Sequence, residues 1–124
     1  MRLGVIELVS VPVTDQARSK EFYEDKLGFK VISDDQFGEG QRWVQLEPPG
    51  GGVNITLVTW FDDMPPGSLK GLVISCDDVD GTVGELRDRG VQLGGPPEDM
   101  AWGRFASVQD PDGNTLLLRQ APTA

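Results

Sequence analysis

A turn near the C-terminus constrains the fold more than any other feature of the chain. Asp110-Pro111-Asp112-Gly113 suits a type I turn, because Asp is favoured at the first position, Pro at the second and Gly at the fourth. Short apolar-rich segments flank it at 105–109 and 115–118. The stretch therefore predicts a β-hairpin.

This hairpin has a degenerate copy 62 residues earlier. The same offset relates Asp15 to Asp77, Gly28 to Gly90, Arg42 to Arg104, Pro49 to Pro111 and Gly51 to Gly113. Two copies of 62 residues fill the whole chain of 124. The sequence therefore predicts one structural unit that occurs twice.

Both copies read as a strand, a helix and three further strands. The predicted strands cover residues 3–13, 29–33, 42–47 and 53–60 in the first copy, and 69–76, 91–93, 105–109 and 115–118 in the second. The first helix is capped by Thr14 or Asp15, the second by Asp77 or Asp78, and each ends at a glycine.

The two copies form a single domain over residues 1–124. Residues 62–68 contain two prolines and no periodic pattern, so we expect a linker there. Unit 1 then covers about residues 1–61 and unit 2 about residues 69–124. The predicted class is α+β, with a curved, barrel-like, antiparallel-rich sheet around a cleft between the repeats, where a small ligand is expected.

Charge and composition exclude several classes of function. Eleven Lys and Arg against 20 Asp and Glu give a net charge of −9, which argues against nucleic acid or an anionic membrane as partner. No apolar run is long enough to span a membrane, and no signal peptide is evident, so we expect a cytoplasmic protein. The single cysteine, Cys76, cannot form an internal disulfide and reads as a buried small residue.

Three groups of residues resemble the vicinal oxygen chelate superfamily: 11–15, 22–29, and Trp102-Gly103 followed by 110–114. That superfamily includes glyoxalase I, bleomycin resistance proteins, fosfomycin resistance enzymes and extradiol dioxygenases. The resemblance covers the whole chain, because these proteins are built from paired βαβββ units. It implies this fold and a homodimer, but no single activity.

The metal enzymes of this superfamily hold a divalent ion with His, Glu or Gln from the first and last strands of the units. Carried over by motif spacing, these positions fall at Leu8, Leu117, Ile55 and one of Leu69, Lys70 or Gly71. None of them donates to a metal at neutral pH, and the chain contains no His. We therefore expect no metal and no other cofactor.

The remaining candidates for the cleft are aromatic and basic. Trp43, Trp60 and Trp102 can stack on a planar ligand or can pack a core or dimer interface. Arg42 and Arg104 occupy equivalent places and either clamp an anionic or carbonyl-bearing ligand or form cross-strand ion pairs. With Leu8, Ile55 and Leu117, these three tryptophans and two arginines make up the predicted ligand-binding set. Phe61 and Phe105 have the same two alternatives, stacking or packing.

Three functions remain open at this point. The favoured hypothesis is a metal-free protein that resembles bleomycin resistance proteins and sequesters a small aromatic or planar ligand in the inter-repeat cleft. The alternative is an enzyme, a glyoxalase-like lyase or a dioxygenase, with an atypical metal site. A third hypothesis is a structural or regulatory dimer whose cleft is filled by its own side chains.

Overall fold

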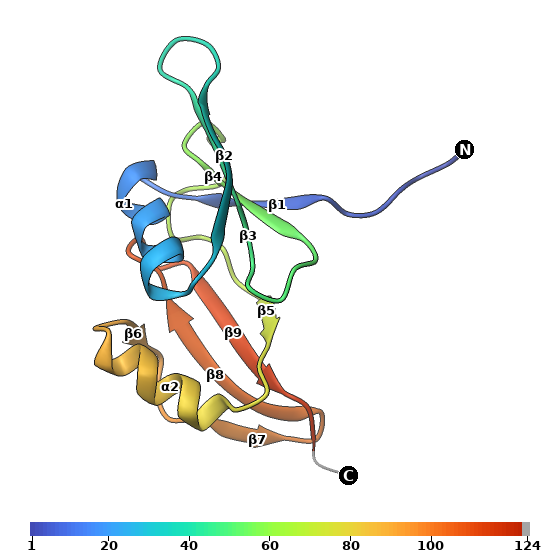
Figure 1. The fold of residues 1–124 in the computed structure, drawn as a ribbon, viewed down its shortest axis with the longest axis vertical. Coiled ribbons are helices and arrows are strands. Elements are labelled where there is room, and N and C mark those ends of the chain that lie inside the picture. Colours follow the sequence, from blue (N-terminus) through green and yellow to red (C-terminus); the bar gives the residue numbers. More distant parts are fainter. Residues whose placement is uncertain (123–124) are drawn as a thin grey trace. The chain divides into compact units, whose positions relative to one another are not determined.

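The chain folds into two compact units, divided between Pro66 and Gly67. The computed structural model describes residues 1–122, and Figure 1 shows their elements in chain order. Each unit combines helix with its own open sheet, so the α+β class is confirmed. None of the helices in residues 1–122 is both long and apolar enough to cross a membrane.

Unit 1 contains a mixed four-stranded sheet. Its strands, in the spatial order β1-β4-β3-β2, are β1 (Leu8–Pro12), β4 (Asn54–Val58), β3 (Arg42–Glu47) and β2 (Lys30–Gln36). The two pairings that involve β3 are antiparallel, but β1 pairs with β4 in parallel. The sheet is thus antiparallel-rich and not wholly antiparallel, because the helical crossover after β1 returns the chain in its original direction.

The predicted first strand begins later than the sequence suggested. Residues 3–7 lie outside β1, and Leu3, Val5 and Ile6 are 72–89% exposed. The reason is the partner strand: β4 begins at Asn54, opposite Leu8, so earlier residues have no strand beside them. Figure 1 shows the N-terminal segment leaving the sheet of unit 1.

The helical segment of unit 1 consists of α1 (Gln16–Glu21) and a π-helical turn, η1 (Phe22–Lys26). Asp15 caps it by accepting a hydrogen bond from the Arg18 backbone N–H at 3.1 Å. Gly28 follows with φ of +78°, a conformation that glycine adopts without strain. The predicted cap and the glycine at the end are both confirmed.

Unit 2 has the same order of elements as unit 1, with one additional strand. Its elements are β5 (Leu72–Ser75), α2 (Val79–Asp88), β6 (Gln92–Leu93), β7 (Glu98–Met100), β8 (Gly103–Gln109) and β9 (Thr115–Gln120). The strand order is β5-β9-β8-β6, with β7 also paired to β8. Strand β7 could not be predicted from the sequence, because its three residues are all exposed and show no apolar alternation.

The predicted turn after β8 is confirmed, and it also anchors the segment that leads into β5. The Gly113 N–H donates to the Asp110 carbonyl at 3.0 Å, and the Asp110 carboxylate accepts from three N–H groups of Asp112 and Asn114. The Asn114 side-chain oxygen then accepts from the Leu69 N–H at 3.0 Å. Because Asp110 and Asn114 are buried, these bonds are shielded from water.

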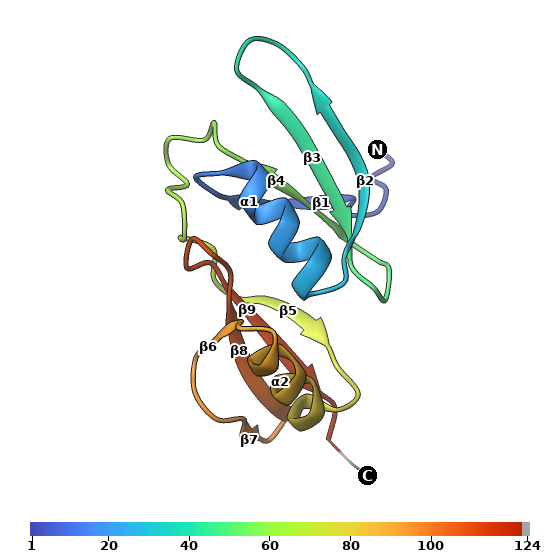
Figure 2. The ribbon, with the colours of Figure 1, turned by 60° about the vertical axis from the view of Figure 1, so that its left-hand side comes forward.

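In each unit the helix covers one face of the sheet (Figure 2). In β3, Val44 and Leu46 are fully buried on the helix side, while Trp43 and Gln45 alternate with them and point to the opposite side. In β8, Ala106 and Val108 are buried in the same way, while Phe105 and Ser107 point away from α2. We call the face without a helix the open face of each unit.

The anchoring turn can be tested by removing its central carboxylate. Asp110→Ala leaves three N–H groups without an acceptor, and we expect it to lower the free energy of unfolding by about 2 kcal/mol. The measurement is urea denaturation followed by circular dichroism. Asp63→Ala, in the exposed linker, is the matched control and is expected to change stability little. Equal effects of the two substitutions would contradict the anchoring role.

Candidate functional site

The open face of unit 2 contains a hollow of about 230 Å³. Its lining comprises Gly94, Gly95, Pro96, Glu98, Met100, Phe105, Ala106, Ser107 and Leu117. Leu117 lies directly opposite Ser107 on one side and Val73 on the other. The floor is therefore formed by strand residues, which hold a fixed geometry.

Aromatic and small residues shape this hollow. The rings of Trp102 and Phe105 meet edge to face with centroids 6.4 Å apart, and Trp102 is 59% exposed. The Gly94 N–H donates to the Ser107 carbonyl at 3.0 Å, and a Cβ at Gly94 would collide with the Ser107 hydroxyl. Glycine thus lets the loop after β6 lie against β8 and form one wall.

The open face of unit 1 carries a second aromatic group. Phe37 meets Trp43 at 6.1 Å and Trp60 at 5.4 Å between ring centroids. The Trp43 indole N–H donates to the Gln45 side-chain oxygen at 3.1 Å, which fixes both side chains. Because indoles and phenyl rings offer large flat surfaces, this group can stack on a planar molecule.

A polar row crosses the same face. Ser10, Thr56 and Gln45 lie opposite one another on β1, β4 and β3. The Thr56 hydroxyl is buried and has no hydrogen-bond partner within residues 1–122. Leu8, two residues before Ser10, points to the same face.

Ile55 does not lie on an open face. It is 2% exposed and opposite Leu46, on the side that the helix covers. The strict repeat relates Ile55 to Leu117, but the turn between β3 and β4 contains one residue more than the turn between β8 and β9. The structural counterpart of Leu117 is therefore Thr56, because a shift of one residue moves a side chain to the other face.

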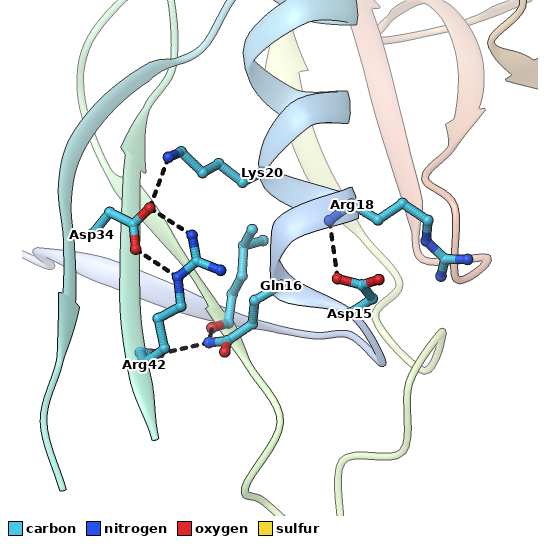
Figure 3. A network of polar contacts seen from close by, with 7 residues as sticks. Asp15, Gln16, Arg18, Lys20, Asp34 and Arg42 are labelled. Atoms are coloured by element: carbon cyan, nitrogen blue, oxygen red, sulfur yellow. Dashed lines mark hydrogen bonds and ion pairs between the residues drawn. The ribbon is translucent and has the colours of Figure 1, made fainter. Parts of the chain in front are cut away.

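Arg42 also lies on the helix side, in a partly exposed ion-pair network (Figure 3). Its guanidinium donates to Asp34 at 2.6 and 2.7 Å, and Lys20 of α1 donates to the same carboxylate at 2.7 Å. Hydrogen bonds from Arg42 and then Lys20 hold the pKa of Asp34 well below its usual range. This geometry matches the ion-pair alternative for Arg42 and not the ligand clamp.

Arg104 is engaged in the same way in unit 2. Its guanidinium donates to Asp80 of α2 at 2.9 and 3.1 Å and to Asp99 of β7 at 3.0 Å. These bonds, first to Asp80 and then to Asp99, raise the pKa of Arg104 above its ordinary value. Arg104 thus joins β8 to α2 directly, whereas Arg42 joins β3 to Asp34 of β2, which Lys20 links to α1.

The Asp34 network predicts a dependence of stability on acid. Because its folded-state pKa is lowered, Asp34 stabilises the fold above its unfolded pKa of about 4 and loses this contribution progressively as pH falls further. We expect Asp34→Asn to lower the free energy of unfolding by about 1 kcal/mol at neutral pH. Urea midpoints measured across the acid range should show wild type and variant converging.

Asp35→Asn is the control for this experiment. Asp35 is exposed and adjacent in sequence, and its side chain points to the opposite face from Asp34. A difference between wild type and Asp34→Asn that stays constant across the acid range would contradict the assignment.

The structure groups most of the predicted residues by face. Leu8 and Trp43 lie on the open face of unit 1, where Phe37 joins Trp60 to Trp43, and Leu117 lies on that of unit 2 with Trp102 just before β8. The predicted ligand-binding set did not include the following residues of these faces: Phe37, Gln45, Thr56, Glu98, Met100, Phe105 and Ser107. The predicted hairpin places Ser107 opposite Leu117, and alternation along the strand then places Phe105 on the same face. Nothing in the sequence indicates that Phe37 lies against Trp60.

A family model described as "Glyoxalase/Bleomycin resistance protein/Dioxygenase superfamily" matches residues 5–118. The chain belongs to this superfamily. The solved structure of TnmS3, an antibiotic binding protein from Streptomyces sp. CB03234, is 44% identical, with a TM-score of 0.90 over 98% of this chain and 99% of that one. A glyoxalase/bleomycin resistance protein from the same organism is 46% identical, with a TM-score of 0.81 over 92% of this chain and 98% of that one.

A relative of similar length has no described activity. The uncharacterized protein YetH of Bacillus subtilis is 34% identical over 118 residues, which is 93% of this chain and 97% of YetH. These similarities span nearly the full length of both chains in each comparison, so they concern the whole two-unit fold.

The residues of this superfamily member do not fit the divalent metal of the family's enzymes. Corrected for the longer turn, the four strand positions are Leu8, Thr56, Gly71 and Leu117. One hydroxyl and no carboxylate or imidazole among them make a poor donor set. Within residues 1–122, no group of three or more His, Cys, Asp or Glu side chains could hold an ion.

Proposed function

We propose that this protein binds a small aromatic or planar molecule without a metal and sequesters it, as a member of the bleomycin-resistance branch of the superfamily would. The observation that carries the proposal is the chemistry of the open faces. They carry aromatic rings, Trp43 with Phe37 and Trp102 with Phe105. In a metal enzyme of the family the same faces would present metal ligands.

The residues of these faces are suited to binding a flat molecule. A flat ligand stacked on Phe105 or Trp43 gains from burial of both surfaces and from the ring quadrupole. The polar groups nearby, Ser107 and Gln45, can orient such a ligand through hydrogen bonds. The similarity to TnmS3, whose structure is described as that of an antibiotic binding protein, supports the same conclusion. That the ligand binds in a cleft between the two repeats remains a prediction.

Tryptophan fluorescence tests this proposal. Titration with a panel of aromatic antibiotics and metabolites should give saturable quenching by at least one compound, with the same Kd after dialysis against a chelator. Phe105→Ala should raise that Kd about fivefold or more, because a stacking partner is lost.

Phe22→Ala is the matched control, since Phe22 is an aromatic residue of η1, away from the open faces. Its Kd is expected to equal that of wild type, with folding of both variants checked by circular dichroism. Flat titrations across the panel, or binding that is abolished by the chelator, would refute the proposal.

We also propose a homodimer, as the family resemblance implies. Leu3, Val5 and Ile6 expose apolar side chains next to the edge strand β1, and a second copy of the chain could cover them. Light scattering should give twice the monomer mass of 13.5 kDa, and Ile6→Ser combined with Leu3→Ser should shift the mass toward the monomer. A monomeric wild-type protein would contradict this assembly.

A further inference from the structure

The open face of unit 2 carries a row of four residues on neighbouring strands. Ser75 of β5 lies opposite Arg119 of β9, Arg119 opposite Phe105 of β8, and Phe105 opposite Glu98 of β7. Directly opposite residues point to the same face of a sheet. Phe105 therefore has a cation on one side and a carboxylate on the other.

The Arg119 side chain is held in place by a hydrogen bond to the backbone. Its Nε donates to the Trp102 carbonyl at 2.9 Å, which leaves the two terminal nitrogens of the guanidinium for another acceptor. A Cβ at Gly103 would come within 2.5 Å of the Gln120 carbonyl oxygen, and 3.4 Å from the Arg119 side chain. The glycine thus allows the start of β8 to lie close against the end of β9, where Arg119 is found.

The charged residues of this row are not paired with each other, unlike those on the helix side. Arg104 and Asp99, which lie opposite each other one position along the same strands, form an ion pair. Within residues 1–122, Arg119 and Glu98 form no ion pair, and Glu98 lines the hollow beside Phe105. The open face thus presents a cation and an anion separated by two strand spacings, about 9 to 10 Å.

We infer that unit 2 selects an aromatic ligand that has an anionic or carbonyl acceptor on one edge and a protonated amine or other N–H donor on the opposite edge. The ring stacks on Phe105, Arg119 binds the acceptor and Glu98 binds the donor. This inference rests on the proposed binding function and specifies the chemical class of its ligand. Arg119 and Glu98, in place of Arg42 and Arg104, are then the charged residues that determine specificity.

Four naphthalene probes test the inference by isothermal titration calorimetry. The first carries a carboxylate at one end and an aminomethyl group at the other; the remaining three carry the carboxylate alone, the aminomethyl group alone, or an uncharged hydroxymethyl group. The doubly charged probe should bind about tenfold more tightly than either singly charged probe. Arg119→Gln should remove the preference for the carboxylate, and Glu98→Gln the preference for the amine.

Two further variants separate recognition from folding. Arg119→Lys keeps the cation and should retain part of the carboxylate preference, and Arg104→Gln should leave the ranking of the probes unchanged. Circular dichroism verifies that each variant is folded. Equal binding of all four probes would overturn the charge assignment while supporting aromatic binding; binding of none would overturn both this inference and the proposed function.

Discussion

The helix of each unit covers one face of its sheet, and this contact decides which side chains can meet a ligand. Val44 and Leu46 in unit 1, and Ala106 and Val108 in unit 2, form the cores beneath α1 and α2. Because strand residues alternate, every second residue must then point to the open face. The same packing that stabilises each unit thereby leaves a row of side chains on rigid strands that the helix does not cover.

Much of the fold could be predicted from local sequence signals, because each signal corresponds to one kind of local structure. Asp15 and Asp78 cap their helices, Gly28 and Gly90 adopt positive φ after them, and Asp110 begins a hydrogen-bonded turn. What sequence could not supply was pairing between distant strands. The start of β1 is set by where β4 begins, and β7 forms only because β8 provides its partner.

The candidate site was less predictable, since it depends on register and on partners in space. One extra residue in the turn before β4 places Thr56, and not Ile55, on the open face. Arg42 and Arg104 look available in the sequence, but acidic residues from other elements occupy both of them. For the tryptophans the sequence indicates only packing or stacking, because large aromatic residues at strand ends have few alternatives, and their contact with a ligand stays a prediction.

The central claim is that a planar ligand binds to the open faces and not to the helix side. The most direct measurement is nuclear magnetic resonance of isotope-labelled protein titrated with an aromatic compound that quenches its fluorescence. The account predicts shifts at the indole of Trp43 or Trp102 and at the amides of Ser107 and Leu117, with little change at residues of α1 and α2. Shifts confined to the helices would contradict it.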